Sequence, residues 1–332
     1  MAEVRTVGLL GGGVIGGGWA ARFLLAGVDV KLFDPDPAAE RKLGEILTNA
    51  RTAWSELIDA PLAVEGTATI VTTVAEAVSG VDFVQESAPE RLELKQALLA
   101  EADSAAAPGI VIASSTSGLL PTLMSANMTN PQRLVVGHPF NPVYLLPLVE
   151  ICGGERTAAW AGDRAAAIYE SVGMRPLRVR KEIDGFVADR LLEALWREAL
   201  WLVNDGVATV EEVDDAIRFG AGLRWSFMGT YKTYRIAGGE GGMRHFMEQF
   251  GPSLQWPWTH LMDVPELTDS LLDQIAQQSD DQVGEAGVRE LERWRDRSLI
   301  AVIRGLSAVP TGAGEVLVQY QDRLRTSATS AG

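Results

Sequence analysis

One apolar stretch of the chain, residues 135–151, carries three polar residues whose types and spacing suit acid–base chemistry. His138 is followed by Asn141 three residues later and by Glu150 twelve residues later. A histidine exchanges protons near neutral pH, and a carboxylate partner holds its ring in one tautomer. The stretch predicts either a buried strand–turn–strand with a structural histidine or the general base of a proton-transfer reaction. The rest of the chain decides between these interpretations.

The composition is that of a globular protein and excludes several partners. The chain has 332 residues, of which 47% are hydrophobic and 22% charged, which predicts about two domains. The formal net charge of −15 argues against nucleic acid and anionic membranes as partners and does not favour polyanionic substrates. The expected partner is a small molecule.

Cysteine content and the N-terminus predict a cytoplasmic location. A single cysteine, Cys152, rules out an internal disulfide and fits a reducing compartment. We expect it to be buried rather than nucleophilic. No basic segment followed by an apolar run opens the chain, and no run of about 18 apolar residues occurs.

The first forty residues have the pattern of a dinucleotide-binding unit. A glycine-rich turn lies between an apolar run at residues 4–10 and a helical pattern at 17–27, and a second apolar run ends at Asp34. Glycines there permit the tight bend, the approach of a pyrophosphate and close helix packing. A phosphate-binding turn at a helix N-terminus is therefore expected, with a merely glycine-rich turn as the alternative. Its residues are Gly11, Gly12, Gly13, Val14, Ile15 and Gly16.

Asp34 indicates which dinucleotide binds. It lies eighteen residues after Gly16, where a carboxylate accepts hydrogen bonds from ribose hydroxyls. Since a carboxylate would repel a 2′-phosphate, the sequence favours NAD over NADP.

Further apolar runs predict that the sheet continues to the histidine. They alternate with helical patterns and occupy residues 68–72, 81–86, 110–113 and 134–137. One run ends in consecutive serines and threonine up to Ser117, and the last run ends at His138. Because the carboxyl ends of parallel strands border the ligand crevice, we expect Ser117 and His138 on the cofactor side. Helix capping is the alternative role for the serines.

After Gly185 the pattern changes to helices alone, at residues 186–203, 210–218, 243–250, 267–276 and 288–304. The expected fold class is therefore α/β. We predict a Rossmann-type NAD-binding domain at 1–184, an all-helical substrate and dimerisation domain at 185–322, and a disordered tail at 323–332. The apolar helices favour a homodimer. The scattered histidines and single cysteine predict no metal site.

Together these motifs resemble the L-3-hydroxyacyl-CoA dehydrogenase family, over about residues 4–230. The matching motifs are the glycine turn, Ser115-Thr116-Ser117, His138-Pro139-Phe140-Asn141-Pro142, Glu150 and Gly185-Phe186-Val187-Ala188-Asp189-Arg190. Within the family, residues 138–150, 225–230 and 251–258 resemble the branch that oxidises L-carnitine.

The resemblance implies a role for each matched residue. His138 would take the proton of the 3-hydroxyl, and Glu150 would hydrogen-bond the far ring nitrogen. Ser117 and Asn141 would bind the oxygen that becomes the ketone, while hydride passes to NAD. The implied cofactor residues are those of the glycine turn with Asp34, Glu90, Lys95 and Ser117.

Two departures from the family pattern bear on the substrate. The family often has asparagine where this chain has Asp189. The aspartate is predicted to balance a positive charge, either that of a cationic substrate or that of His138. The alternative is a charge at a helix N-terminus that pairs with Arg190. Residues 50–66 replace the basic segment that binds coenzyme A in relatives. They contain one arginine, no lysine and three acids, whereas CoA phosphates need several cations. The sequence therefore favours a small free substrate.

L-carnitine has a trimethylammonium group and a carboxylate. Aromatic faces bind a quaternary ammonium, and we expect the contacts to be Phe140, Tyr144, Trp225 and Phe227. Candidates for the carboxylate are Arg190, Arg224 and Lys181. Three alternatives are open. The first is the same chemistry on L-gulonate, which is disfavoured because this acidic chain lacks the extra cationic side chains that an anion needs. The others are a 3-hydroxyacyl-CoA dehydrogenase and a non-enzymatic NAD-binding protein.

Overall fold

The computed structural model of the chain describes residues 4–227, 229–237, 246–248, 259–260, 266, 268–271, 273–274, 285 and 288–330. It divides into two compact units. The first consists of Met1–Val187 with Arg293–Gly332, and the second of Ala188–Glu292. The division differs from the expected one because the end of the chain returns to the first unit.

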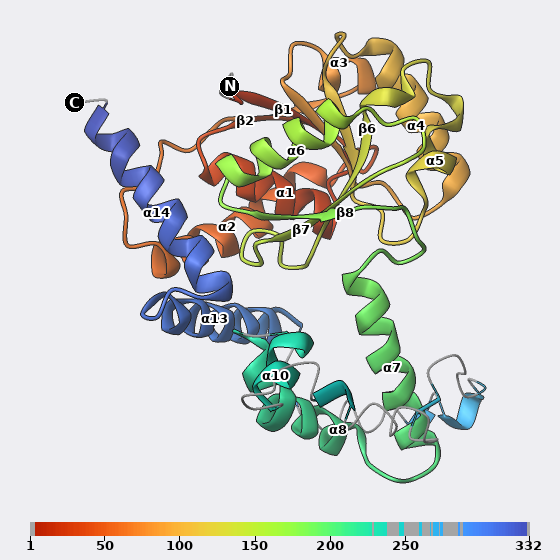
Figure 1. The fold of residues 1–332 in the computed structure, drawn as a ribbon. Helices are drawn as coiled ribbons and strands as arrows, with labels where there is room; N and C mark the ends of the chain where they lie inside the picture. The colour runs from red at the N-terminus through yellow and green to blue at the C-terminus, as the bar shows by residue number, and fades with distance from the viewer. Residues whose placement is uncertain are drawn as a thin grey trace. The chain divides into compact units, whose positions relative to one another are not determined.

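An eight-stranded sheet in the order β3-β2-β1-β4-β5-β6-β7-β8 forms the centre of the first unit (Figure 1). Neighbouring strands are parallel except β6 and β7, which are antiparallel. The strands are β1 Thr6–Leu10, β2 Asp29–Phe33, β3 Ala68–Val71, β4 Phe83–Glu86, β5 Val111–Ser114, β6 Leu134–Pro139, β7 Leu148–Gly153 and β8 Arg175–Val179. The order reverses between β1 and β4, which makes the crevice at their carboxyl ends the expected ligand site.

Helices cover both faces of this sheet (Figure 1). The expected α/β architecture is therefore confirmed. One apolar cluster joins the sheet to α1 (Val14–Leu25), α2 (Ala39–Leu57) and α6 (Ala159–Ser171). A second joins the other face to α3 (Val74–Val78), α4 (Leu92–Ala105) and α5 (Pro121–Met124).

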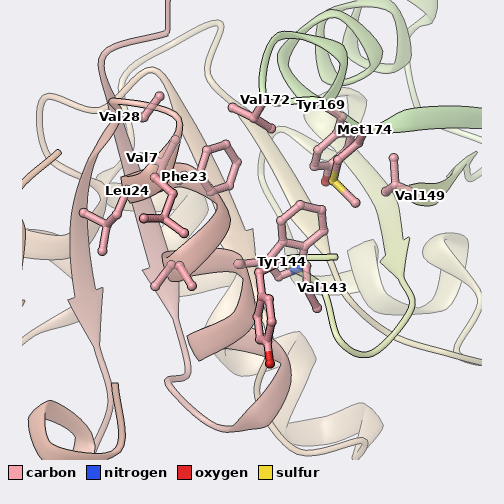
Figure 2. Packing of buried hydrophobic residues seen from close by; sticks show 14 of the residues in the cluster. Val7, Phe23, Leu24, Val28, Val143, Tyr144, Val149, Tyr169, Val172 and Met174 are labelled. Carbon is pink, nitrogen blue, oxygen red and sulfur yellow. The ribbon is translucent and has the colours of Figure 1, made fainter. Parts of the chain in front are cut away.

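The larger cluster is built around aromatic side chains. The Trp19 ring stacks on Tyr169 at 5.1 Å between centroids and on Phe23 at 5.8 Å. Figure 2 shows Phe23 and Leu24 of α1, Tyr169 of α6, and Val143 and Tyr144 of the loop after β6, which belong to this cluster. Burial of each large apolar side chain contributes roughly 1.5–3 kcal/mol, so this cluster fixes α1 and the loop against the sheet.

A C-terminal hairpin, defined here as residues 293–330 of α13 (Val288–Ser307) and α14 (Gly312–Ser330), packs on the same cluster. Ile300, Ile303, Leu317 and Tyr320 are its buried contacts. Disorder was expected from residue 323, whereas α14 continues to Ser330. Arg323 explains part of this difference, because it donates to the Glu170 carbonyl at 2.7 Å and lies over the Tyr320 ring.

The described part of the second unit contains helices and no strand. They include α7 (Ala188–Asn204), α8 (Val210–Ala216), α9 (Gly222–Trp225) and α10 (Thr230–Ala237). Thr209 caps α8 in a reciprocal capping box with Glu212, as the sequence pattern indicates. Of the helix expected at residues 243–250, only 246–248 are described, and they are helical. Of the one expected at 267–276, residues 269–271 and 273–274 are helical, and 267, 272, 275 and 276 lie outside the described residues.

Candidate active site

The glycine turn between β1 and α1 has the shape that a dinucleotide requires. Gly11 has φ +99°, a conformation that favours glycine, and a Cβ on Gly16 would lie 1.9 Å from the Gly11 carbonyl oxygen. At Gly13 a Cβ would meet nothing within 4 Å, and Val14 after it is 64% exposed. The turn is thus closely packed at Gly16 and open at Gly13, which fits a pyrophosphate at the N-terminus of α1.

Asp34, which directly follows β2, hydrogen-bonds to the same glycine turn. Its Oδ2 accepts a hydrogen bond from the Gly12 amide at 2.5 Å, and its Oδ1 accepts from the Asp36 amide at 2.7 Å. A carboxylate has further lone pairs, so the ribose hydroxyls of NAD can still donate to it.

Glu90 and Lys95, the other expected cofactor residues, belong to one charge cluster after β4. Lys95 is buried and donates to Glu86 at 2.8 Å and to the Ala88 carbonyl at 2.9 Å. Glu90 lies 3.4 Å from Lys95 and accepts from the Ser117 amide at 3.0 Å. Burial would raise the pKa of Glu90, but the hydrogen bonds, led by Thr116, and the charge of Lys95 lower it overall. The cluster fixes the serine-rich turn after β5.

His138 and Glu150 form the pair that the sequence predicted. They stand opposite each other in the antiparallel β6–β7 ladder. The His138 Nδ1 lies 3.0 Å from Glu150 Oε2, and the side chains are 5% and 0% exposed. The second carboxylate oxygen, Oε1, accepts from the Val187 amide at 3.0 Å. Glu150 therefore holds the histidine ring through Nδ1, so the other nitrogen, Nε2, is the one with which the ring would act on a substrate.

A buried polar network behind His138 was not anticipated. Tyr169 donates to Gln85 Oε1 at 2.5 Å, and Gln85 Nε2 donates to Ser115 Oγ at 2.8 Å and to the Gly137 carbonyl at 3.3 Å. A Cβ on Gly137 would lie 1.9 Å from the Tyr169 hydroxyl, so a larger residue there would displace this hydroxyl from the network. The sequence signal of this network was Gln85, a polar residue that follows Phe83 and Val84 in β4.

The expected substrate-oxygen residues end neighbouring strands. Ser117 follows β5 and Asn141 follows β6, strands that pair in parallel, and both residues are exposed. Phe140 is half-buried, and the centroid of its ring lies 4.8 Å from the centroid of the His138 ring. Tyr144 does not join this group, because its side chain is buried in the large cluster and its hydroxyl donates to Asp296 at 2.6 Å.

The remaining candidates for the substrate ends lie in the second unit or at its border. Asp189 and Arg190 begin α7, and Arg224 is in α9. Trp225 and Phe227 are 45% and 42% exposed. Lys181 is an exposed residue of the first unit.

Residues 50–66 offer no cationic surface for coenzyme A. Their arginine, Arg51, forms a bidentate ion pair with Glu65 at 2.6 and 3.0 Å. Asp59, in the same stretch, pairs with Arg304 of α13 at 3.0 Å. The arginine of this stretch is therefore already paired with an acid of the same stretch.

Cys152 lies in the core of β7, 0% exposed. Burial, followed by the charges of Glu182 and Glu150, raises the pKa of its thiol to about 11, which suits a structural residue. In the described ranges of the chain, His, Cys, Asp and Glu form no cluster suited to a metal ion. No single helix there is long and apolar enough to cross a membrane, and only α13 and α14 taken together, across a 78° bend, meet the criterion.

Comparison with known proteins agrees with this geometry. The family description "3-hydroxyacyl-CoA dehydrogenase, NAD binding domain" matches residues 6–183, and "3-hydroxyacyl-CoA dehydrogenase, C-terminal domain" matches residues 185–269. Among solved structures, a 5-formyl-3-hydroxy-2-methylpyridine 4-carboxylic acid 5-dehydrogenase is 28% identical with a TM-score of 0.77, over 92% of this chain and 99% of that one.

Two curated relatives are more similar in sequence. An L-carnitine dehydrogenase of Mesorhizobium japonicum is 56% identical over 95% of this chain and 86% of that protein. An L-carnitine dehydrogenase/betainyl-CoA thioesterase of Agrobacterium fabrum is 54% identical over 96% of this chain, which spans 65% of that protein's length.

Proposed function

Because this chain belongs to the 3-hydroxyacyl-CoA dehydrogenase family and is an NAD-dependent dehydrogenase of 3-hydroxy substrates, we propose that its substrate is L-carnitine. The reaction converts the 3-hydroxyl to a ketone: L-carnitine and NAD+ give 3-dehydrocarnitine, NADH and a proton. The buried pair of His138 and Glu150 at 3.0 Å is the observation that carries the proposed mechanism.

In this mechanism Nε2 of His138 takes the hydroxyl proton, while Nδ1 keeps its bond to Glu150. The imidazolium that forms is stabilised by the carboxylate of Glu150, which is shielded from water. Ser117 and Asn141, at the ends of adjacent strands, hydrogen-bond the substrate oxygen and so align C3. When bound, NAD supplies the hydride acceptor. The glycine turn, Asp34, Glu90 and Lys95 would hold it.

Three properties support a small substrate with a quaternary ammonium group rather than an acyl-CoA. Arg51, the arginine of residues 50–66, is engaged by Glu65. The net charge of −15 disfavours a polyanion. Phe140 presents a half-exposed aromatic ring beside the histidine, and aromatic faces attract quaternary ammonium groups by about 0.5–2 kcal/mol each. L-Gulonate, an anion without such a group, fits these properties less well.

Residues of the second unit are proposed to bind the two ends of the substrate. Exposed Trp225 and Phe227 are suited to the trimethylammonium end. Arg190 and Arg224 are candidates for the carboxylate, with Lys181 of the first unit as another. We also retain the proposals that Asp189 balances a positive charge and that the protein is a cytoplasmic homodimer.

The experiment is to measure NADH formation by the purified protein with L-carnitine, D-carnitine, L-gulonate and 3-hydroxybutyryl-CoA. We expect the largest kcat/KM with L-carnitine. A larger value with the acyl-CoA or with gulonate would replace the proposed substrate, and no reaction with any of the four would contradict the proposed 3-hydroxy oxidation.

A further inference from the structure

The loop between β6 and β7, residues 140–147, joins the strand of His138 to the strand of Glu150. It also carries Asn141, proposed above to bind the substrate oxygen. Within the loop, the amides of Leu145 and Leu146 both donate to the Pro142 carbonyl at 2.9 Å. The end of the loop is joined to β8, where the Arg175 amide donates to the Pro147 carbonyl at 2.7 Å. The middle of the loop is instead held by side chains of other elements.

Two buried side chains hold the backbone of this loop. Arg22 of α1 donates from Nε to the Val143 carbonyl at 2.7 Å, and Trp54 of α2 donates from Nε1 to the Tyr144 carbonyl at 2.7 Å. Burial lowers the pKa of Arg22 to about 10. The charge nevertheless remains at neutral pH, so the bond from Arg22 persists there.

A third anchor comes from the C-terminal hairpin. The Tyr144 hydroxyl donates to Asp296 Oδ2 at 2.6 Å, and both residues are buried, 6% and 7% exposed. Arg295 lies 2.8 Å from the other oxygen of Asp296. Figure 2 shows the Tyr144 ring beside Val143. A buried phenol–carboxylate bond is charge-assisted and stronger than a neutral one, so it orients the tyrosine and the loop that carries it.

We infer that Tyr144 and Asp296 are positioning residues, through which the C-terminal hairpin holds the β6–β7 loop, and with it Asn141, in the place that oxidation requires. Tyr144 thus acts on the reaction through the loop and not by touching the substrate. The inference rests on the proposed function in one respect, the contact of Asn141 with the substrate oxygen.

The first test compares Tyr144→Phe with Tyr320→Phe. Both changes remove one hydroxyl from a ring that packs with the C-terminal hairpin, and both rings are 6% exposed. Tyr320 makes ring contacts with Trp54 and Arg323, whereas Tyr144 bonds Asp296. Because misplacement of a reacting group by about 1 Å can cost about 100-fold, we expect kcat of Tyr144→Phe to fall roughly 10- to 100-fold. KM and NADH affinity should change less. Equal losses in the two variants would overturn the inference.

A double-mutant cycle asks whether Tyr144 acts through Asn141. If it does, the variant with both Tyr144→Phe and Asn141→Ala should be no slower than Asn141→Ala alone. Multiplicative losses in kcat would show that the two residues act independently and would contradict the inference.

Amide hydrogen exchange separates the inference from the proposed substrate. Exchange at Leu145 and Leu146 should be at least about tenfold faster in Tyr144→Phe than in the wild type or Tyr320→Phe, because loosening the loop opens the bonds to Pro142. Unchanged exchange would refute the anchoring whatever the substrate. If the wild type fails to oxidise L-carnitine but exchange responds as expected, only the proposed substrate is wrong.

Discussion

Replacing Glu150 with glutamine removes the negative charge beside His138 and keeps the size of the side chain. The two charged groups would be about 4 Å apart between charge centres, and at an effective dielectric constant of about 20 they attract by about 4 kcal/mol. Proton transfer is partial in the transition state, so we expect a loss of about 2–4 kcal/mol. That loss corresponds to a kcat roughly 30- to 1,000-fold below the wild type.

The assay is steady-state NADH formation with saturating substrate, and the matched control is Glu182→Gln. Glu182 is a half-buried acid of the same unit that accepts hydrogen bonds from the Thr122 amide at 3.0 Å and from its hydroxyl at 2.5 Å. The control variant should keep kcat within about threefold of the wild type. A folded Glu150→Gln protein whose kcat equals that of the control would refute the role of the carboxylate.

Further predictions concern the cofactor site, the thiol and stability at high pH. In Gly16→Ala the new Cβ meets the Gly11 carbonyl at 1.9 Å, so NADH affinity measured by fluorescence should fall at least about tenfold; unchanged affinity would argue against the turn as the cofactor site. Asp34→Ala should lower the ratio of kcat/KM for NAD over NADP by about tenfold or more, and a constant ratio would contradict discrimination by this carboxylate. Cys152, with its pKa near 11, should react with iodoacetamide at pH 8 only as fast as the protein unfolds; rapid labelling of the native protein would oppose this. Burial raises the pKa of Tyr320 from its ordinary value near 10 to about 12, so its stabilising contribution is complete below pH 10 and is lost as pH rises to about 12. The Tm should fall less steeply over that window in Tyr320→Phe than in the wild type.

Local patterns predicted the parts of the site that lie close together in sequence. The glycine turn with Asp34, and the pair of His138 with Glu150, depend on short spacings and on strand ends. The structure joins Asp34 to the Gly12 amide and brings His138 within 3.0 Å of Glu150; the roles of these residues stay predictions. Strand β8 and helix α6 were not predicted, because their small, charged and apolar residues do not follow a clear helix or strand period. Strand β8 lies at the edge of the sheet and has exposed residues, so it lacks the apolar run of a buried strand.

Contacts between distant parts of the chain could not be predicted from such patterns. Tyr144 was expected at the substrate because it follows the histidine by six residues, yet its partner is Asp296, 152 residues away. The return of α13 and α14 to the first unit has the same cause, since an amphipathic helix indicates that it packs but not on what. The Gln85–Tyr169 bond spans 84 residues and was missed for that reason.

The central claim is that His138 acts as the base in oxidation of L-carnitine by NAD, and one measurement tests it most directly. Wild-type protein and a His138→Gln variant are each mixed with L-carnitine and NAD, and NADH is followed against time. The wild type should form NADH together with an equal amount of 3-dehydrocarnitine. The variant should bind NADH normally but turn over at least about 100-fold more slowly. Turnover of L-carnitine at the wild-type rate by the variant would contradict the account.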